Sequence, residues 1–284
     1  MKKSPLSASL LFLGFFGFLG GQVSQATLNA QTTDIQENPE SAPVTPWVPV
    51  REPGCGGWMT SVEVSPHDSR HILVGGDLLS IGLSHNRGET WEPVFGFYST
   101  EIGDTTFHPE NPNIIWAGTM SGPYRSTDGG KHWTEMRGGD FPEIAKYHYS
   151  APIEKVLFDP NDSDRLLAFG GSSRNWGSPG NNTLWGAVWE SCDAGENWKK
   201  IASLEKNIVS ATFAPGSSDV LLVAVSGRGI FRSEDGGHTW KSSSEGLPHG
   251  NVERVAVHPK NPKICWVSLN SCEQKETENT EGNT

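Results

Sequence analysis

Two long segments of the sequence carry the side chains best suited to holding a sugar. One runs over residues 138–152 and the other over residues 172–185. Aromatic rings pack on the C–H faces of a sugar ring while amides, carboxylates and guanidinium groups bind its hydroxyls. The candidate ligand-binding residues are therefore Tyr147, His148, Tyr149, Arg174 and Trp176, joined by Arg228 from a later segment. A structural alternative stays open: Trp185 begins a strand, Tyr147 and Tyr149 cover a sheet edge, and the polar loops are ordinary connections.

A run of acids offers a second chemistry, cation binding. Asp159, Asn161, Asp162 and Asp164 have the alternate spacing of a calcium loop. The glycine at the sixth position and the closing glutamate of that motif are missing, so we interpret the run as a turn between two strands. The sequence has no His-Glu-x-x-His or Gly-x-Ser-x-Gly motif either, and we expect no cofactor and no metal.

The charge of the chain argues against some classes of binding partner. The chain has 284 residues with a formal net charge of −11, and its first 26 residues hold two lysines and no acid, so the charge without them is more negative still. Such a surface repels phosphate backbones, which argues against nucleic acid and anionic membranes as partners. Four cysteines, at positions 55, 192, 265 and 272, form no Cys-x-x-Cys pair and allow three disulfide pairings.

The first residues have the order of a secretory leader. Lys2 and Lys3 precede an apolar run that ends at Gly21, and small residues follow up to Ala26. We therefore expect residues 1–26 to be a signal peptide, residues 27–44 a disordered linker, residues 45–272 the folded body and residues 273–284 a polar tail. A chain with this leader is secreted or periplasmic, and no later stretch is apolar enough to span a membrane.

The folded body is built from repeats. An eight-residue pattern that begins with serine and ends with tryptophan occurs four times, with its serines 42, 65 and 42 residues apart. The repeated positions are Ser84, Asn86, Gly88 and Trp91; Ser126, Asp128, Gly130 and Trp133; Ser191, Asp193, Gly195 and Trp198; and Ser233, Asp235, Gly237 and Trp240. A period of about 42 residues is the size of one propeller blade.

A second marker, a proline at the end of a β-type run, precedes each of these boxes. The marker prolines of the four boxes are Pro66, Pro109, Pro160 and Pro215, and Pro259 repeats the marker without a box after it. In the second repeat four short strand-like runs follow one another, over residues 105–108, 114–119, 123–126 and 132–136. The sequence therefore predicts an all-β propeller of four-stranded blades, with four complete blades and a partial fifth. Either the chain is a shortened relative of a larger propeller, or a small ring closes in a way that the sequence does not show; we favour the first.

The boxes have a mechanical explanation. Each would lie on the turn between the third and fourth strands, where the aspartate accepts hydrogen bonds from backbone N–H groups, glycine supplies unusual backbone angles and tryptophan fills the space between sheets. We therefore interpret the boxes as structural. Strand order then places the long segments 138–152 and 172–185, with Glu101, Asp104 and Arg228, at the opposite end of the blades from the boxes.

The boxes and their Tyr/Phe-Arg-Ser lead-in (residues 124–126 and 231–233) resemble the BNR/Asp-box superfamily, which includes sialidases, sortilin-type receptor propellers and glycoside hydrolase family 74. Locally the sequence from Trp47 to Asp77 is most similar to the first blade of family 74, the xyloglucan-cleaving enzymes. That resemblance implies a catalytic role for Asp77, although Leu78-Leu79 stands where the family has Gly-Gly, and the second acid that the family uses is not matched. The counterparts of Asp77 eleven residues after the other marker prolines are Met120, Gly171, Ser226 and Asn270.

The resemblance implies an exported, carbohydrate-associated propeller related to glycoside hydrolases and catalytically incomplete, since a glycosidase normally needs two carboxylates. A non-catalytic scaffold that binds a peptide or protein, as sortilin-type propellers do, is the alternative. The sequence leaves open whether the chain is an enzyme and what its oligomeric state is. The Arg-Ile-Pro motif of sialidases is missing.

Overall fold

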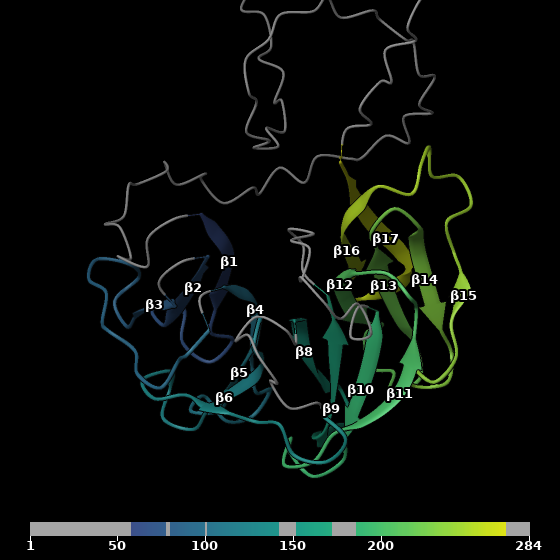
Figure 1. Cartoon of the computed structure of the whole chain (residues 1–284). Coiled ribbons are helices and arrows are strands. Elements are labelled where there is room, and N and C mark those ends of the chain that lie inside the picture. Colours follow the sequence, from purple (N-terminus) through teal and green to yellow (C-terminus); the bar gives the residue numbers. More distant parts are fainter. Residues whose placement is uncertain (1–57, 78–79, 100, 142–151, 172–185, 271–284) are drawn as a thin grey trace, which may run out of the picture. The chain divides into compact units, whose positions relative to one another are not determined.

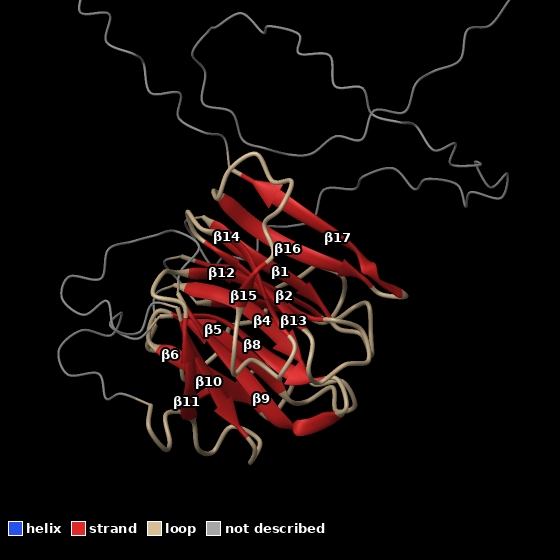
Figure 2. Ribbon diagram, turned by 90° about the vertical axis from the view of Figure 1, so that its right-hand side faces the viewer, coloured by secondary structure: helices blue, strands red, loops and turns tan. Residues whose placement is uncertain are grey.

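The computed structural model describes residues 58–77, 80–99, 101–141, 152–171 and 186–270. The predicted leader, linker and tail lie outside these residues. Every described element is a β-strand, and Figure 2 shows the strands in red joined by loops in tan. No helix that is long and apolar enough to cross a membrane occurs in the described part of the chain.

Four antiparallel sheets follow one another along the chain in the arrangement of propeller blades. Sheet 1 contains β1 (Met59–Val64), β2 (Ile72–Gly76) and β3 (Ile81–Ser84). Sheet 2 contains β4 (Ile102–Phe107), β5 (Ile115–Thr119), β6 (Gly122–Ser126) and β7 (Thr134–Glu135). Sheet 3 contains β8 (Ile153–Asp159), β9 (Asp162–Gly170), β10 (Ala187–Ser191) and β11 (Lys199–Ser203), and sheet 4 contains β12 (Ile208–Phe213), β13 (Leu221–Val225), β14 (Gly229–Ser233) and β15 (Lys241–Ser242). The prediction of an all-β propeller is confirmed.

The first and last parts of the series differ from the regular blade. In sheet 1 the place of a fourth strand is taken by a single bridge between Leu83 and Glu92. Pro93 follows directly and has no N–H with which to extend the ladder. After sheet 4, β16 (Val252–His258) and β17 (Asn261–Leu269) form a two-stranded sheet. That this end sheet is a partial fifth blade stays a prediction.

The first strand of each sheet lies innermost. β1 packs against β4, β4 against β8, β8 against β12 and β12 against β16, and Figure 1 shows these strands nearest the centre with the later strands outside them. Four apolar clusters fill the spaces between successive sheets, with Leu73, Trp116, Leu167 and Leu222 at their centres. The core is therefore a series of layers between sheets, and each sheet depends on its neighbours for burial.

The boxes lie on the turn after the third strand of each of the four sheets. In all four, the serine Oγ accepts a hydrogen bond from the N–H of the glycine four residues on, at 2.8–2.9 Å, and donates to the Oδ1 of the Asp or Asn. Asn86 takes the aspartate's place through its own Oδ1, which accepts from the N–H of Thr90 at 2.9 Å. The hydroxyl and N–H of Thr239 hold the pKa of Asp235 at about 2.

Two consecutive residues of each box have left-handed backbone angles. The first of the two tolerates side chains, since Arg87 and Ala194 occupy it with φ of 62° and 53°. The second is always glycine, and at Gly195 a Cβ would lie 2.2 Å from the ring of Trp116 in the preceding sheet. The glycine is therefore required by the close approach of the preceding sheet as well as by its backbone angle.

Candidate functional site

A repeated hydrogen bond marks the end of the sheets that is opposite the boxes. The residue directly after the second strand donates its N–H to the carbonyl of the residue just before the first strand. The pairs are Asp77 and Trp58 (3.2 Å), Met120 and Glu101 (3.1 Å), Gly171 and Pro152 (3.0 Å), Ser226 and Asn207 (2.9 Å), and Asn270 and Asn251 (2.9 Å). We call these ten residues the rim. The hydrogen bonds place Asp77 and its four predicted counterparts at equivalent positions.

Asp77 is the only one of these five equivalent positions that carries an acid, and it is anchored. Its Oδ1 accepts a hydrogen bond from the N–H of Trp58 at 2.7 Å, and the side chain is half-buried at the end of β2. A fixed, partly accessible carboxylate can bind a sugar hydroxyl or take part in acid–base chemistry. Among the described rim residues the other carboxylate is Glu101, which is buried in the neighbouring sheet.

A second polar level lies deeper on the innermost strands. Each of these strands has a register shift near its start, between Met59 and Ser61 in β1 and at the same place in β4, β8, β12 and β16. The polar residue five positions before each marker proline lies at this shift. We call these residues the bulge tier: Ser61, Asp104, Lys155, Ser210 and Arg254. Bulges redirect side chains and are frequent beside functional sites.

Charges of the bulge tier are paired between sheets. Lys155 Nζ lies 2.6 Å from Asp104 Oδ2, and Arg254 Nη1 lies 3.1 Å from Oε1 of the buried Glu154. Glu63 lies on β1 two residues beyond Ser61. Burial raises the pKa of Glu63 to about 7, with Lys155 opposing the shift and Asp104 adding to it. A carboxyl group of this kind exchanges its proton near neutral pH.

Asp77 and Glu63 do not form a glycosidase pair. Glu63 pairs with Leu73 on β2, four positions before Asp77, which corresponds to about 13 Å along the strand. The two carboxyl groups of a glycosidase lie roughly 5–9.5 Å apart. Asp77 and Glu63 thus lie at different levels along the strands.

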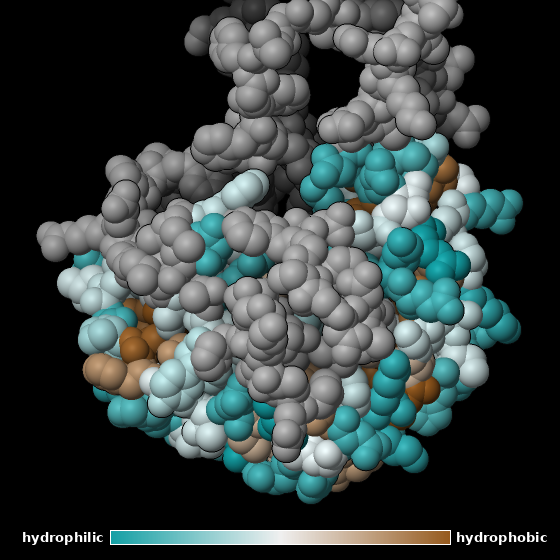
Figure 3. All heavy atoms as spheres, in the orientation of Figure 1, coloured by the Kyte–Doolittle hydropathy of each residue, from teal (hydrophilic) through white to brown (hydrophobic). Residues whose placement is uncertain are grey.

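Most of the predicted ligand-binding residues cannot be placed. Tyr147, His148, Tyr149, Arg174 and Trp176 lie outside the described residues. Arg228 is described, in the turn between β13 and β14 at the rim end. Its Nη1 donates to the carbonyl of Leu204 at 3.2 Å, and its guanidinium lies 5.2 Å from the ring centre of Phe231. Figure 3 shows the described part of the face drawn in Figure 1 as mainly polar.

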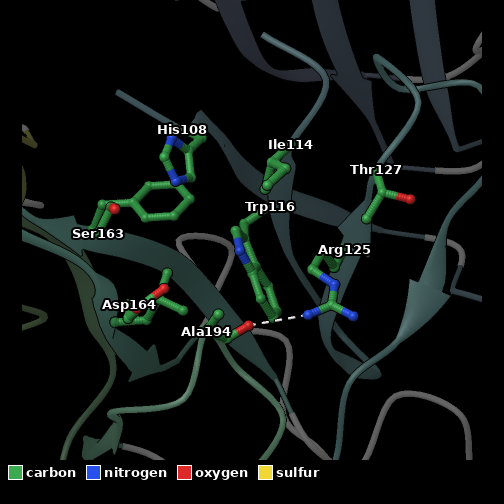
Figure 4. Close-up of a pocket in the computed structure, with 10 residues that line it drawn as sticks. His108, Ile114, Trp116, Arg125, Thr127, Ser163, Asp164 and Ala194 are labelled. Atoms are coloured by element: carbon green, nitrogen blue, oxygen red, sulfur yellow. Dashed lines mark hydrogen bonds between the residues drawn. The ribbon is translucent and has the colours of Figure 1, made fainter. Parts of the chain in front are cut away.

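A small cavity lies between sheets 2 and 3 on the box side (Figure 4). Trp116, Phe158 and Leu166 line it, and Arg125 reaches across Trp116 to donate to the carbonyl of Ala194 at 3.1 Å. Its volume is about 90 Å³. The aromatic and aliphatic side chains that line it belong to the apolar cluster between the two sheets. We assign it to the packing between sheets.

The acidic run spans the turn between β8 and β9, as predicted. Asp159 ends β8, residues 160–161 form the turn, and Asp162 and Asp164 lie on β9. The buried Asp159 accepts hydrogen bonds from Arg165 at 2.6 Å and from the hydroxyl of Ser218 at 2.6 Å. Its oxygens are thus taken by protein donors. No group of three potential metal ligands occurs in the described ranges. Among those ranges, Cys192 and Cys265 are exposed free cysteines.

Sequence comparison relates the chain to glycoside hydrolases and to sortilin. Xyloglucanase Xgh74A of Acetivibrio thermocellus is 25% identical over 267 residues, covering 77% of this chain and 29% of the relative. A xyloglucanase of Paenibacillus sp. is 26% identical over 217 residues, covering 64% of this chain and 21% of the relative. The family model described as Sortilin-Vps10 (sortilin, neurotensin receptor 3) matches residues 186–282.

Solved structures agree on the fold. An ancestral GH74 enzyme superposes with a TM-score of 0.60 at 20% identity, over 76% of this chain and 28% of that chain. The GH74 enzyme of Niastella koreensis superposes with a TM-score of 0.57 at 18% identity, over 74% and 33%. The chain is a propeller related to glycoside hydrolases. The chain spans less than a third of the length of the Acetivibrio and Paenibacillus xyloglucanases.

Proposed function

We propose that this chain is an exported propeller that binds glycan at the rim and is incomplete as a hydrolase. The observation that carries the proposal is Asp77: an acid at one of five equivalent rim positions, held by the N–H of Trp58 and half-buried. Because the chain is similar to xyloglucanases, a glycan is the first class of ligand to test. Export rests on the leader-like order of residues 1–26.

The proposal that the chain is incomplete as a hydrolase depends on whether a second carboxylate can act together with Asp77. Among the described residues at the rim end, Glu63 is too far along β1 to assist Asp77, Glu101 is buried and Asp104 is paired with Lys155. A protonated leaving group and an activated nucleophile need two carboxylates at a fixed separation. We therefore expect binding without bond cleavage.

The experiment compares wild type with Asp77→Ala on a glycan array that contains xyloglucan oligosaccharides, together with a reducing-sugar assay. Glu110→Ala is the matched control, since Glu110 is an exposed acid in the turn between β4 and β5 at the box end. We expect wild type and Glu110→Ala to bind equally, Asp77→Ala to bind about tenfold more weakly, and none to release sugar. Sugar release that Asp77→Ala abolishes would show a complete hydrolase, and an array without any binding would remove the glycan proposal.

The match to the sortilin family supports a second candidate function, a scaffold for a peptide or protein. It covers sheet 4 and the end sheet, where Arg228 offers a cation at the rim end. Retention of a peptide library by wild type, with no glycan bound on the array, is the outcome that favours this function.

A further inference from the structure

The side chains that pack between successive sheets come from two fixed places in the repeat. The residue seven positions after the marker proline, on the second strand, faces the following sheet. It is Leu73, Trp116, Leu167 and Leu222 in sheets 1–4, at most 5% exposed in each. The residue four positions before the marker proline, on the first strand, faces the preceding sheet. It is Thr105, Val156, Ala211 and Val255, at most 6% exposed in each.

The same two places are exposed at the two ends of the series. Val62 of β1 occupies the place that would face a preceding sheet, and it is 66% exposed. Trp266 of β17 occupies the place that would face a following sheet, and it is 54% exposed. Val64 on β1 and Ile264 on β17 are exposed beside them, at 48% and 42%. Figure 1 shows β1 and β17 at opposite ends of the series of sheets.

We call the exposed side of β1 the β1 face and the exposed side of β17 the β17 face. The two faces are complementary. Each is one half of a contact that the chain makes repeatedly between its own sheets, as when Trp116 and Val156 share one apolar cluster. The following sheet also offers a box glycine to the incoming side chain: Leu73 lies against Gly130, Trp116 against Gly195 and Leu167 against Gly237. Sheet 1 has its own box glycine, Gly88, buried with φ of 81°, and no sheet before it among the described residues. The two halves therefore fit each other, and no other described residue of the chain fills either of them.

We propose that the β17 face of one copy docks on the β1 face of a second copy, head to tail, with Trp266 packed against Val62 and the first box. Such a contact joins two different surfaces, so it closes into a ring when the rotation allows and otherwise extends. It also continues the rim from Asn251 and Asn270 of one copy to Trp58 and Asp77 of the next. The inference is independent of the proposed glycan binding.

The test measures molar mass by sedimentation velocity and light scattering over a range of concentrations. We expect wild type to assemble, and Val62→Glu and Trp266→Glu each to weaken association about tenfold or more, because a charge then replaces the centre of the contact. Tyr98→Ser is the matched control, since Tyr98 is 74% exposed on neither face. It should assemble as wild type does.

Mixing the two variants distinguishes head-to-tail docking from any other association. Val62→Glu keeps an intact β17 face and Trp266→Glu keeps an intact β1 face, so the mixture should form one-to-one pairs although each variant alone is monomeric. This result also excludes unfolding as the cause of the monomeric state. A wild type that stays monomeric at every concentration, or variants that assemble like wild type, would overturn the proposal.

Discussion

At the scale of single residues, Glu63 shows how burial changes chemistry. Its position on the innermost strand raises the pKa of its carboxyl group to about 7, against an ordinary value of 4.5. The folded protein therefore binds this proton more tightly than the unfolded chain does. The contribution of Glu63 to stability is most favourable below pH 4.5 and is lost as the pH rises through 7.

Glu63→Gln should accordingly raise the free energy of unfolding at pH 8, on the order of 1–3 kcal/mol, and change it little at pH 4. The glutamine keeps the shape of the protonated acid and cannot ionise. Urea unfolding of both proteins at the two pH values measures the difference. The exposed Glu89→Gln serves as control. A Glu63→Gln difference that is the same at pH 4 and pH 8 would contradict the account.

Sequence alone predicted the box residues but could not predict Glu63. The boxes repeat four times, and Asn86 could be assigned the role of aspartate because it keeps an acceptor oxygen. Glu63 has no counterpart in the other repeats and lies in an ordinary strand. Its pKa depends on burial and on Lys155 and Asp104, which are distant in sequence.

At the scale of elements, one arginine joins sheet 2 to the box of sheet 3, and another joins sheet 3 to the box of sheet 4. Arg125 of β6 donates to the carbonyl of Ala194, and Arg165 of β9 donates to the carbonyl of Gly236 at 2.7 Å. Arg165 also binds the buried Asp159 and Glu190, at 2.6 and 2.8 Å. The box turn is thus held from both sides, by its own aspartate and by a cation from the preceding sheet.

Replacing Arg165 by methionine should destabilise the protein by roughly 3–5 kcal/mol, because Asp159 would stay buried without its cation. Thermal and denaturant unfolding measure the loss. Arg70→Met is the matched change, since Arg70 pairs with Asp68 on the open surface, and it should leave stability unchanged. Equal changes in the free energy of unfolding for Arg165→Met and Arg70→Met would show that the Arg165 link between sheets does not stabilise the protein.

The strands of sheet 2 were predicted to within a few residues, because turn residues and the marker prolines delimit them. The bulge tier was not predicted, although a signal for it exists. Aligning the repeats on the marker prolines shows a polar residue five positions earlier in every case, from Ser61 to Arg254. This polar residue lies at a bulge because the register shifts there between the first and second strands, and the sequence does not reveal that shift.

At the scale of the whole described body, the two ends of the sheets differ in role. The box end is occupied by hydrogen bonds that the protein makes to itself, and its cavity lies in the apolar packing between sheets 2 and 3. The rim end carries Asp77, Arg228 and the starts of the innermost strands. The boxes therefore mark the structural end of the sheets, and we propose that a ligand binds at the opposite end.

The most direct test of this account is amide hydrogen exchange with and without a xyloglucan oligosaccharide. We predict protection in the rim turns, at residues 76–77, 119–121 and 226–228, and none in the box turns at residues 127–132 and 234–239. Protection confined to the box turns, or no change at either end with saturating oligosaccharide, would contradict the claim that this propeller binds glycan at its rim.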